Sequence, residues 1–430
     1  MTKFKTAIII FGDAAIFYLA LILTLITRYG FDNFEKPLSA HLKPFSLILV
    51  VWLLIFYIVD LYKSRYLKIN LETIKNLILA VAVGIIASII LFYLFPSFFK
   101  LTPKTNLIIF SLIFGTLNII FRFAIMKIYI SGGFKNRLLF IGNSPIINEV
   151  INYLKNNPQL GYDVLAQTNE YLKIENYQAD TIVIHPHFKK NPEFIKTIYR
   201  LIPQKIAVID LTEFYENIFQ KIPLEELEDD WFIKEVVVNR RIYDFTKRSI
   251  DIILSFILGI ILITIAVFIA IITKLSPRKG PTILKQERVG LNNKTFILFK
   301  FGTMREDVGA LWTAHKDDRI TGLGKFLRYT HLDEIPQLWN IFMGDISFIG
   351  PRAERKELVE LYNQLPYYEI RHIIKPGLTG WAQINYKPSA SIEEAAEKLK
   401  YDIYYIKNRS LVLDFLILLK TIKYLFISSK

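Results

Sequence analysis

Long apolar runs are the first pattern along the chain. Four of them lie in its first third, at residues 6–27, 44–62, 76–98 and 106–128. Each has about the 20 residues that an α-helix needs to cross a bilayer. No small-residue cleavage site follows the first run, so we interpret it as a retained span and not as a removed signal peptide. The pattern predicts four transmembrane helices within residues 1–130.

Basic residues are distributed unequally around these predicted spans. The segments before the first span, between the second and third, and after the fourth contain Lys3, Lys5, Lys63, Arg65, Lys68, Lys75, Lys127, Lys135 and Arg137. The other two loops contain Arg28, Lys36, Lys43, Lys100 and Lys104. Cytoplasmic loops are enriched in Lys and Arg, so we expect the N-terminus and everything after residue 130 to be cytoplasmic. Arg122 lies within the fourth span, near its predicted cytoplasmic end, and we expect it to snorkel to the interface.

Short strands and helices alternate from Arg137 onward. The strand-like segments are RLLFIGN, GYDVLAQ, DTIVIHP and KIAVID, with helical patterns between them. This alternation predicts a small, Rossmann-like parallel α/β domain at 131–215, followed by a connector at 216–243. Gly142 ends the first strand, but Ser144 and Asn148 stand where a dinucleotide-binding loop would have glycines. We therefore favour a scaffold or dimerising role for this domain over cofactor binding.

Composition narrows the class of protein. The chain has 430 residues, 52% of them hydrophobic, and its mean hydropathy of +0.33 is high for a soluble enzyme. Its formal charge of +14 fits an anionic surface or phosphorylated substrates. No segment resembles a nucleic-acid-binding motif, so nucleic acid is not an expected partner. The absence of cysteine excludes disulfides, thiolate nucleophiles and cysteine-ligated zinc.

The adjacent carboxylates Asp333 and Glu334 are the leading candidates for chemistry. Apolar residues recur around them at three- and four-residue spacing, which predicts one buried face of a short helix: Leu332, Ile335, Leu338, Trp339, Phe342 and Met343. Gly344 would end this helix and Thr330 would be its N-cap, with Asp333 as the capping-box partner. The alternative is that the free N–H groups of the first turn attract phosphate, while the carboxylates hold a metal ion. Spacing alone favours the cap.

Several longer motifs favour a functional role for the acidic pair over the helix cap. They are KRSIDIILS at 247–255, GPTILKQERVG at 280–290, and then DDRITGLGKFLRYTHLDEIPQLWNIFMGDISFIGPRA, KPGLTGWAQIN and YDIYYIKNRSLVLDFLILLKTI. In this order they resemble the polyprenyl-phosphate glycosyl-1-phosphate transferases, the bacterial sugar transferases that load lipid carriers. The resemblance covers about residues 244–427. A lone Asp-Glu pair would have been a weak signal.

The resemblance implies a membrane protein with an N-terminal four-helix transmembrane region, the α/β domain, and a mainly helical monotopic catalytic domain at 244–430. In this family a re-entrant membrane helix, here 252–272, enters and leaves the same leaflet. The family's Ser-Pro break is absent, since Ile263 and Thr264 occupy those positions. Gly259 or Thr264 would have to allow the bend, and a full span is the alternative.

The C-terminal apolar segment, 410–427, is interrupted by Asp414, Lys420 and Lys423, and we expect it to lie in the membrane interface. Trp381, in the run KPGLTGWAQINY, is expected to be an interfacial anchor.

The resemblance also implies roles for single residues. Asp333 would attack the sugar-bearing phosphorus of a UDP-sugar, and Glu334 would bind Mg²⁺. Candidate contacts to nucleotide or lipid phosphate are Arg352, Arg328, Lys300, Arg288, Lys285 and Lys375. Gly302 and Ala353 replace an Arg and a Pro that are usual in the family. Lys247, Arg248 and Asp251 match the family's Lys-Arg-x-x-Asp entry to the membrane helix, where we expect them to anchor it at the headgroups.

Three classes of function remain open from the sequence. The favoured one is transfer to undecaprenyl phosphate in the bacterial inner membrane, with glucose or galactose ahead of N-acetylated or deoxyamino sugars. A nucleotide-sugar-modifying enzyme with its active site at 137–215 is the second, and a non-catalytic scaffold of polysaccharide assembly is the third. A homodimer is compatible with each of them. We expect no catalytic role for His315, His331 or His372.

Overall fold

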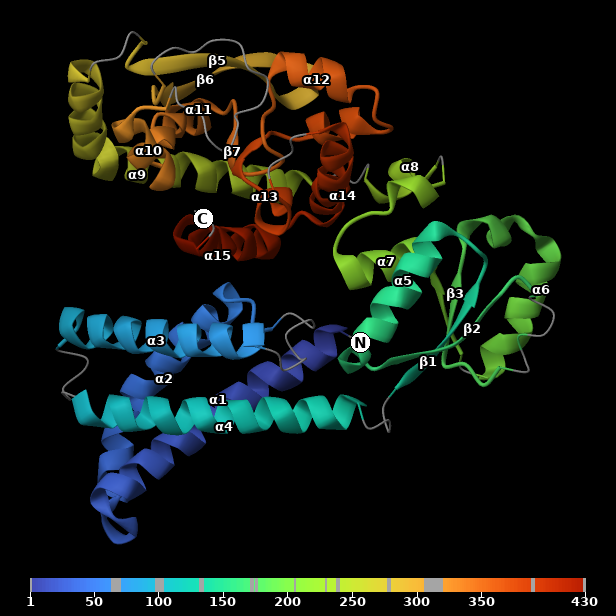
Figure 1. The fold of residues 1–430 in the computed structure, drawn as a ribbon, viewed down its shortest axis with the longest axis horizontal. Coiled ribbons are helices and arrows are strands. Elements are labelled where there is room, and N and C mark those ends of the chain that lie inside the picture. Colours follow the sequence, from blue (N-terminus) through green and yellow to red (C-terminus); the bar gives the residue numbers. More distant parts are fainter. Residues whose placement is uncertain are drawn as a thin grey trace. The chain divides into compact units, whose positions relative to one another are not determined.

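The computed structural model describes residues 2–62, 71–96, 104–130, 135–170, 174, 177–204, 206–228, 230–236, 240–276, 280–304, 320–387 and 391–427. The chain forms two compact units, Met1–Asn217 and Ile218–Lys430 (Figure 1). Some residues named above lie outside the described residues: His315 and the loop cations Lys63, Arg65, Lys68 and Lys100.

The first unit begins with four long helices. They are α1 (Thr2–Tyr29), α2 (Glu35–Ile58), α3 (Leu71–Leu94) and α4 (Lys104–Ile130). All four are long and apolar enough to cross a membrane, by length and composition, at the places where the four spans are predicted. The second begins earlier than predicted because Pro44 lies inside α2 without ending it. Buried aromatic rings form the centre of the bundle, as in the edge-on contact of Phe17 with Phe110.

Arg122 is buried inside this bundle, so the expectation that it snorkels is wrong. Its side chain is 2% exposed and donates to Asp13 Oδ2 at 3.0 Å and to Asn118 Oδ1 at 2.8 Å. It also donates to the Leu61 carbonyl at 3.1 Å. These partners lie on α1, on α4 itself and just beyond α2. The charge of Arg122 therefore links the helices of the bundle, because lipid would offer its guanidinium no hydrogen-bond partner.

A parallel sheet follows in the same unit. Strands β1 (Asn136–Ile141), β2 (Tyr162–Thr168), β3 (Thr181–Ile184) and β4 (Ala207–Asp210) pair in the order β2-β1-β3-β4. The helices between and after them are α5 (Pro145–Asn156), α6 (Pro192–Leu201) and α7 (Leu211–Phe219). This confirms the small parallel sheet. Gly142 has a φ of +122°, and a Cβ there would lie 2.6 Å from His185 Cβ, so close packing alone accounts for the glycine.

The connector packs into the second unit. Ile222, Phe232 and Val236 join a buried cluster with Leu399 and Ile403 of α14 (Ile392–Asn408). Of these, Phe232 belongs to the short helix α8 (Trp231–Glu235). Much of the predicted connector, 216–243, is therefore part of the C-terminal fold and not a free linker.

Helix α9 (Arg241–Leu275) is the long apolar element of the second unit. Near its start, the Asp251 carboxylate accepts from the Ser347 hydroxyl and the Phe348 N–H. Near its end, Ile269 packs against Phe301 and Leu327. In Figure 1 its ribbon changes direction before it leads into β5. Both ends of α9 therefore contact the same unit.

An antiparallel hairpin, β5 (Ile283–Val289) and β6 (Thr295–Phe301), follows α9. Beyond it lie α10 (Gly322–Tyr329), α11 (Gln337–Met343), β7 (Ser347–Ile349), α12 (Lys356–Tyr362), β8 (Gly377–Thr379), α13 (Trp381–Asn385), α14 and α15 (Leu411–Ile427). Asn340, fully buried, fastens α11 to the hairpin: its Oδ1 accepts from the Phe299 N–H at 3.1 Å and its Nδ2 donates to the Ile297 carbonyl at 2.7 Å.

Trp381 is buried and not an interfacial anchor. It is 4% exposed, and its indole N–H donates to the Gln220 carbonyl at 2.9 Å. On α15, Asp414 and Lys420 are buried, while Val412 and Phe415 are exposed. The charged residues of α15 therefore face its own unit, and the apolar ones face outward.

Candidate functional site

The acidic pair lies on a 3₁₀ turn between two helices, so the prediction of one helix around it is wrong. Thr330 ends α10 and donates its hydroxyl to the Phe326 carbonyl, whereas an N-cap would accept. His331 then has a φ of +54°, and the turn Leu332–Glu334 precedes α11. The left-handed backbone at His331 breaks the helical path. Gly344, with a φ of +92°, ends α11 as predicted.

The predicted buried face of α11 is also wrong. Trp339 is 57% exposed and Met343 is 58% exposed, whereas Gln337, Asn340 and Ile341 are buried. The reason is that Asn340 hydrogen-bonds the backbone of β6 and so turns this side of α11 inward. The apolar side faces outward, as it would against lipid.

Glu334 is held by two cations. Its Oε1 accepts from Lys300 Nζ at 2.6 Å and from Arg352 Nη2 at 3.4 Å. Burial raises the pKa of this carboxyl, but Lys300 and Arg352 outweigh burial and hold the pKa at about 2. Glu334 is therefore a carboxylate at any physiological pH.

Asp333 has the opposite electrostatic character. Its side chain is buried, and burial raises its pKa above the usual 3.8, an effect that Lys300 opposes and the Glu334 charge reinforces. Two neighbouring carboxyls thus differ in proton affinity because their surroundings differ. Divergence of this kind is typical of acid–base and nucleophilic sites.

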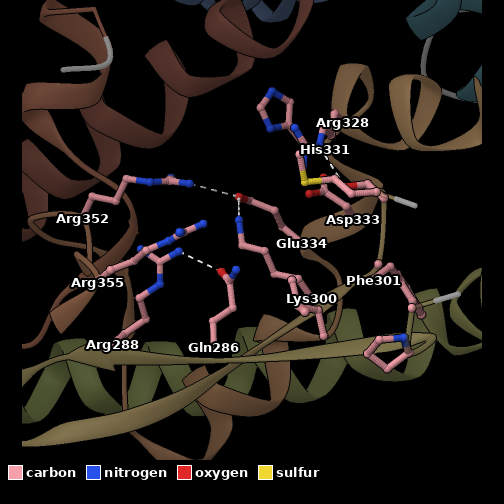
Figure 2. Close-up of a pocket in the computed structure, with 16 residues that line it drawn as sticks. Gln286, Arg288, Lys300, Phe301, Arg328, His331, Asp333, Glu334, Arg352 and Arg355 are labelled. Carbon is pink, nitrogen blue, oxygen red and sulfur yellow. Dashed lines mark hydrogen bonds and ion pairs between the residues drawn. The ribbon is translucent and has the colours of Figure 1, made fainter. Parts of the chain in front are cut away.

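The pair opens onto a cavity of about 310 Å³, within the usual size of a ligand pocket (Figure 2). The cavity brings together Lys300, Arg288, Arg328 and Arg352 with Asp333 and Glu334, as a common phosphate site requires. These residues come from β5, β6, α10, the 3₁₀ turn and the loop after β7. Arg328 is oriented by Thr303, whose hydroxyl accepts from its Nε at 2.8 Å.

The cavity also contains three polar residues that the sequence reasoning missed, Gln286, Thr303 and Arg355. Gln286 lies two positions from Arg288 on β5, so the period of a strand would have found it. Arg355 follows Arg352 by three residues in the same loop. His331 also lines the cavity, whereas His372 is buried and does not line it.

Lys285 and Lys375 do not line the cavity. Lys285 is exposed on the opposite face of β5. Lys375 lies beside Arg248, since a Cβ built at Gly344 would meet both side chains at about 3 Å.

Lys247, Arg248 and Asp251, which we expected to anchor the helix at the lipid headgroups, instead bind partners within their own unit. Lys247 Nζ donates to Asp414 Oδ2 at 2.7 Å. Arg248 donates to the carbonyls of Ile341 and Phe342, at the end of α11. Together with the buried Asp251, these residues fasten α9 to α11, β7 and α15. The contact of Arg248 is favourable because a cation stabilises the carbonyl end of a helix.

The donor set fits a lightly held magnesium ion. Within the described residues no group of three or more His, Asp or Glu side chains surrounds one point. Lys300 and Arg352 both contact Oε1 of Glu334, which leaves Oε2 outside these ion pairs. Mg²⁺ commonly binds through one or two carboxylates together with substrate phosphates and water, and a single carboxylate such as Glu334 is compatible with that mode of binding.

A buried ionic network supports the loop that carries Arg352. Arg371, 4% exposed, donates to the Arg352 carbonyl at 2.9 Å, to Asp402 Oδ2 at 3.1 Å and to the Tyr368 hydroxyl at 2.6 Å. Next to Arg352 in the loop, the Glu354 carboxylate accepts from Lys398 at 2.7 Å. Burial opposes ionisation of Glu354, yet Lys398 and Arg371 hold its pKa at about 2.

Comparison with known proteins gives the same region a family. Residues 242–428 match the bacterial sugar transferase family. An exopolysaccharide production protein from Rhizobium leguminosarum is 37% identical over 41% of this chain and 92% of its own length. The UDP-glucose:undecaprenyl-phosphate glucose-1-phosphate transferase of Klebsiella pneumoniae is 28% identical over 96% of this chain and 93% of its own.

A third relative is the UDP-N-acetylgalactosamine-undecaprenyl-phosphate N-acetylgalactosaminephosphotransferase of Aeromonas hydrophila. It is 35% identical over 51% of this chain, which spans about half of that relative's length at 52%. The acidic pair and its basic cavity lie inside the matched region of the family. The chain belongs to the bacterial sugar transferase family and is a transferase.

Proposed function

We propose that this protein transfers a sugar 1-phosphate from a UDP-sugar to undecaprenyl phosphate, giving undecaprenyl-diphosphate-sugar and UMP, as the first membrane step of polysaccharide assembly. The observation that carries the proposal is the cavity in which Asp333 and Glu334 are surrounded by basic side chains. Joining two phosphorylated substrates is chiefly a problem of charge neutralisation. The names of the Klebsiella and Aeromonas relatives support undecaprenyl phosphate as the acceptor.

In this proposal the reaction proceeds through a covalent phosphosugar–Asp333 intermediate. A carboxylate oxygen of Asp333 bonds to the sugar-bearing phosphorus, the bond to the bridging oxygen breaks, and its electron pair leaves with UMP. An oxygen of the lipid phosphate then displaces Asp333 from that phosphorus. A carboxylate nucleophile divides one difficult displacement into two easier ones. The raised pKa of Asp333 fits this role, because a more basic carboxylate is a better nucleophile.

Glu334 would hold Mg²⁺ in this proposal. The ion would supply positive charge beside the phosphates of the substrate. Lys300 and Arg352 keep Glu334 ionised and, in this proposal, would also donate to phosphate oxygens of the substrate. The guanidinium of Arg352 suits two phosphate oxygens at once.

Glucose is the sugar we favour. The relative that matches nearly the whole chain is named for glucose 1-phosphate transfer, as is that of Escherichia coli, 36% identical over 41% of this chain and 39% of its own length. N-acetylgalactosamine is the alternative, because the Aeromonas relative is named for it. Galactose remains the other hexose to test.

We further propose that α9 is re-entrant and that the N-terminus and the transferase unit face the cytoplasm of the bacterial inner membrane. Contacts at both ends of α9 with one unit support this, since a full span would carry its end away from that unit. The outward apolar residues of α11 and α15 support contact with the same leaflet.

The test is UMP release by the purified full-length protein with Mg²⁺, undecaprenyl phosphate and a panel of UDP-sugars. We expect release with UDP-glucose that is abolished in Asp333→Asn and by chelation of the metal. A ³²P label in the sugar phosphate should remain on the wild-type protein when lipid is omitted. Release that survives Asp333→Asn contradicts the covalent mechanism, and inertness across the panel favours a scaffold.

A further inference from the structure

Gln286 is a neutral residue on a mostly charged wall of the cavity. Leu284, Gln286 and Arg288 line the cavity in turn, because alternate residues of β5 face the same side of the hairpin. Lys285 and Glu287, which lie between them in the chain, are exposed on the opposite face. A neutral amide adds no charge for the attraction of phosphate, so charge does not explain why Gln286 lies in this cavity.

The amide of Gln286 is held in one orientation. Arg288 Nη2 donates to Gln286 Oε1 at 2.8 Å, and Arg288 Nη1 donates to the Ala353 carbonyl at 3.2 Å, so the guanidinium is itself held between two oxygens. A guanidinium can only donate, and a rotated amide would therefore set two donors against each other. Figure 2 shows the result: the oxygen of the Gln286 amide faces Arg288, and its nitrogen faces away from Arg288.

The Nε2 group of Gln286 is therefore a hydrogen-bond donor of fixed polarity at the cavity. Among the described residues, the Gln286 side chain bonds only to Arg288, which leaves the N–H bonds of the amide for a ligand. A sugar hydroxyl both donates and accepts, so a donor of fixed polarity does not select for it. A carbonyl oxygen only accepts, so this donor selects for a carbonyl oxygen.

The surroundings of this donor fit the base of a nucleotide. Leu284 lines the cavity at the next inward position of β5, about 7 Å along the strand. A pyrimidine has apolar faces and a polar edge, and so matches an apolar side chain beside a single donor. The 4-carbonyl of uracil accepts a hydrogen bond, whereas cytosine has an amino group at that position, which donates.

We propose that Gln286 is a specificity-determining residue, which donates from Nε2 to the 4-carbonyl of uracil and so selects uridine over cytidine nucleotides. The inference rests on the proposed function, in which a UDP-sugar is the donor substrate. The phosphates of both kinds of nucleotide meet the same basic groups, so charge does not distinguish them. A site that hydrogen-bonds one ligand rejects an analogue without the matching group, because the polar group of the site is then left unpaired.

The test compares UMP and CMP binding to the full-length protein in nanodiscs by calorimetry. The ratio of the two affinities is the readout, because the phosphates are identical and a change acting through Arg288 weakens both nucleotides equally. We expect the wild type to bind UMP more tightly, and Gln286→Ala to lower the ratio by about fivefold through the loss of one hydrogen bond. Gln286→Glu should lower it by about tenfold or more, since a carboxylate still accepts from Arg288 but opposes the uracil carbonyl with a second acceptor.

Glu287→Gln is the matched control. It makes the reverse exchange of carboxylate and amide one residue further along β5, on the face away from the cavity. Both affinities should therefore stay at their wild-type values.

The outcomes separate this inference from the proposed function. A wild type that binds UMP and CMP equally, or binds neither, overturns the inference, as does a wild-type affinity ratio in both Gln286 variants. A changed preference between UDP-glucose and UDP-N-acetylgalactosamine in Gln286→Ala, with an unchanged UMP/CMP ratio, assigns the amide to the sugar and also overturns it. A wild type that releases no UMP from any UDP-sugar overturns the proposed function alone, because the comparison of UMP with CMP needs no turnover.

Discussion

Replacing Lys300 by Met removes one charge from the centre of the site and keeps most of the aliphatic stem. Lys300 Nζ lies 2.6 Å from Glu334 Oε1, and the two side chains are only 14% and 16% exposed. Two unit charges at that distance attract by about 6 kcal/mol at an effective dielectric constant of about 20. Much of this offsets the cost of removing both groups from water, and breaking such a pair on one side typically costs about 3–5 kcal/mol. We expect about 3 kcal/mol, the lower end of that range, because Arg352 still contacts the carboxylate.

Thermal unfolding in detergent measures this loss. Four of the five tryptophans, Trp231, Trp312, Trp339 and Trp381, lie in Ile218–Lys430, so tryptophan fluorescence reports mainly on the unit that contains the pair. For a unit of this size, 3 kcal/mol lowers the unfolding temperature by about 6–12 °C.

The matched control is the double variant Lys300→Met/Glu334→Gln, which leaves no unpaired buried charge. It should regain most of the lost stability and stay inactive. A single variant that loses less than about 1 kcal/mol, or a double variant as unstable as the single one, would refute the reasoning.

Three further predictions concern neighbouring groups. Glu334 has a pKa of about 2 when folded and an ordinary value of 4.5, so its contribution to stability is complete above about pH 4.5 and is lost as the pH falls toward 2; wild type and Lys300→Met should converge over that window in acid unfolding series. In the proposed mechanism Asp333 attacks in its ionised form, so the acid limb of the pH–rate profile should lie above its ordinary pKa of 3.8. The limb should move upward in Lys300→Met, because Lys300 is the main group that lowers the pKa of Asp333. Arg371→Ala should lower kcat more than it raises KM, because the Arg352 carbonyl loses its hydrogen-bond donor, and Arg371→Lys should restore only part of kcat. Equal losses of kcat and of protein stability in both variants would indicate a purely structural role.

The sequence predicted the elements better than the faces they present. Spanning length identified the four N-terminal helices, and the alternation of short strands and helices identified the parallel sheet. Periodicity shows that one side of α11 is apolar. A face buried in the protein core and a face in contact with lipid are both apolar, so the pattern did not show that Trp339 and Met343 face outward. The prediction that Arg122 snorkels was wrong for a related reason: its partner Asp13 is 109 residues away in the sequence, so no local pattern indicates the pair.

In the candidate site, too, the sequence predicted some residues and missed others. Motifs identified Asp333, Glu334 and Arg352 because they are adjacent or lie in a recognisable run. Gln286 shares a face of β5 with Arg288 and could have been found from strand spacing, whereas Arg355 joins the site through folding, when the loop after β7 meets β5. The charges at the start of α9 were assigned to headgroups because their partners, such as Asp414, are far away in the sequence.

The internal partners of Lys247 and Arg248 also set an order of events during synthesis. Arg248 pairs with a carbonyl 93 residues further along, and Lys247 with a carboxylate 167 residues further. At roughly 5–20 residues per second, these partners leave the ribosome about 5 to 30 s after α9. During that interval the apolar helix α9, most of whose residues are exposed even in the finished fold, lacks the part of its own unit that later covers it. The nascent chain must therefore meet lipid, or a chaperone that substitutes for it, before the transferase unit closes.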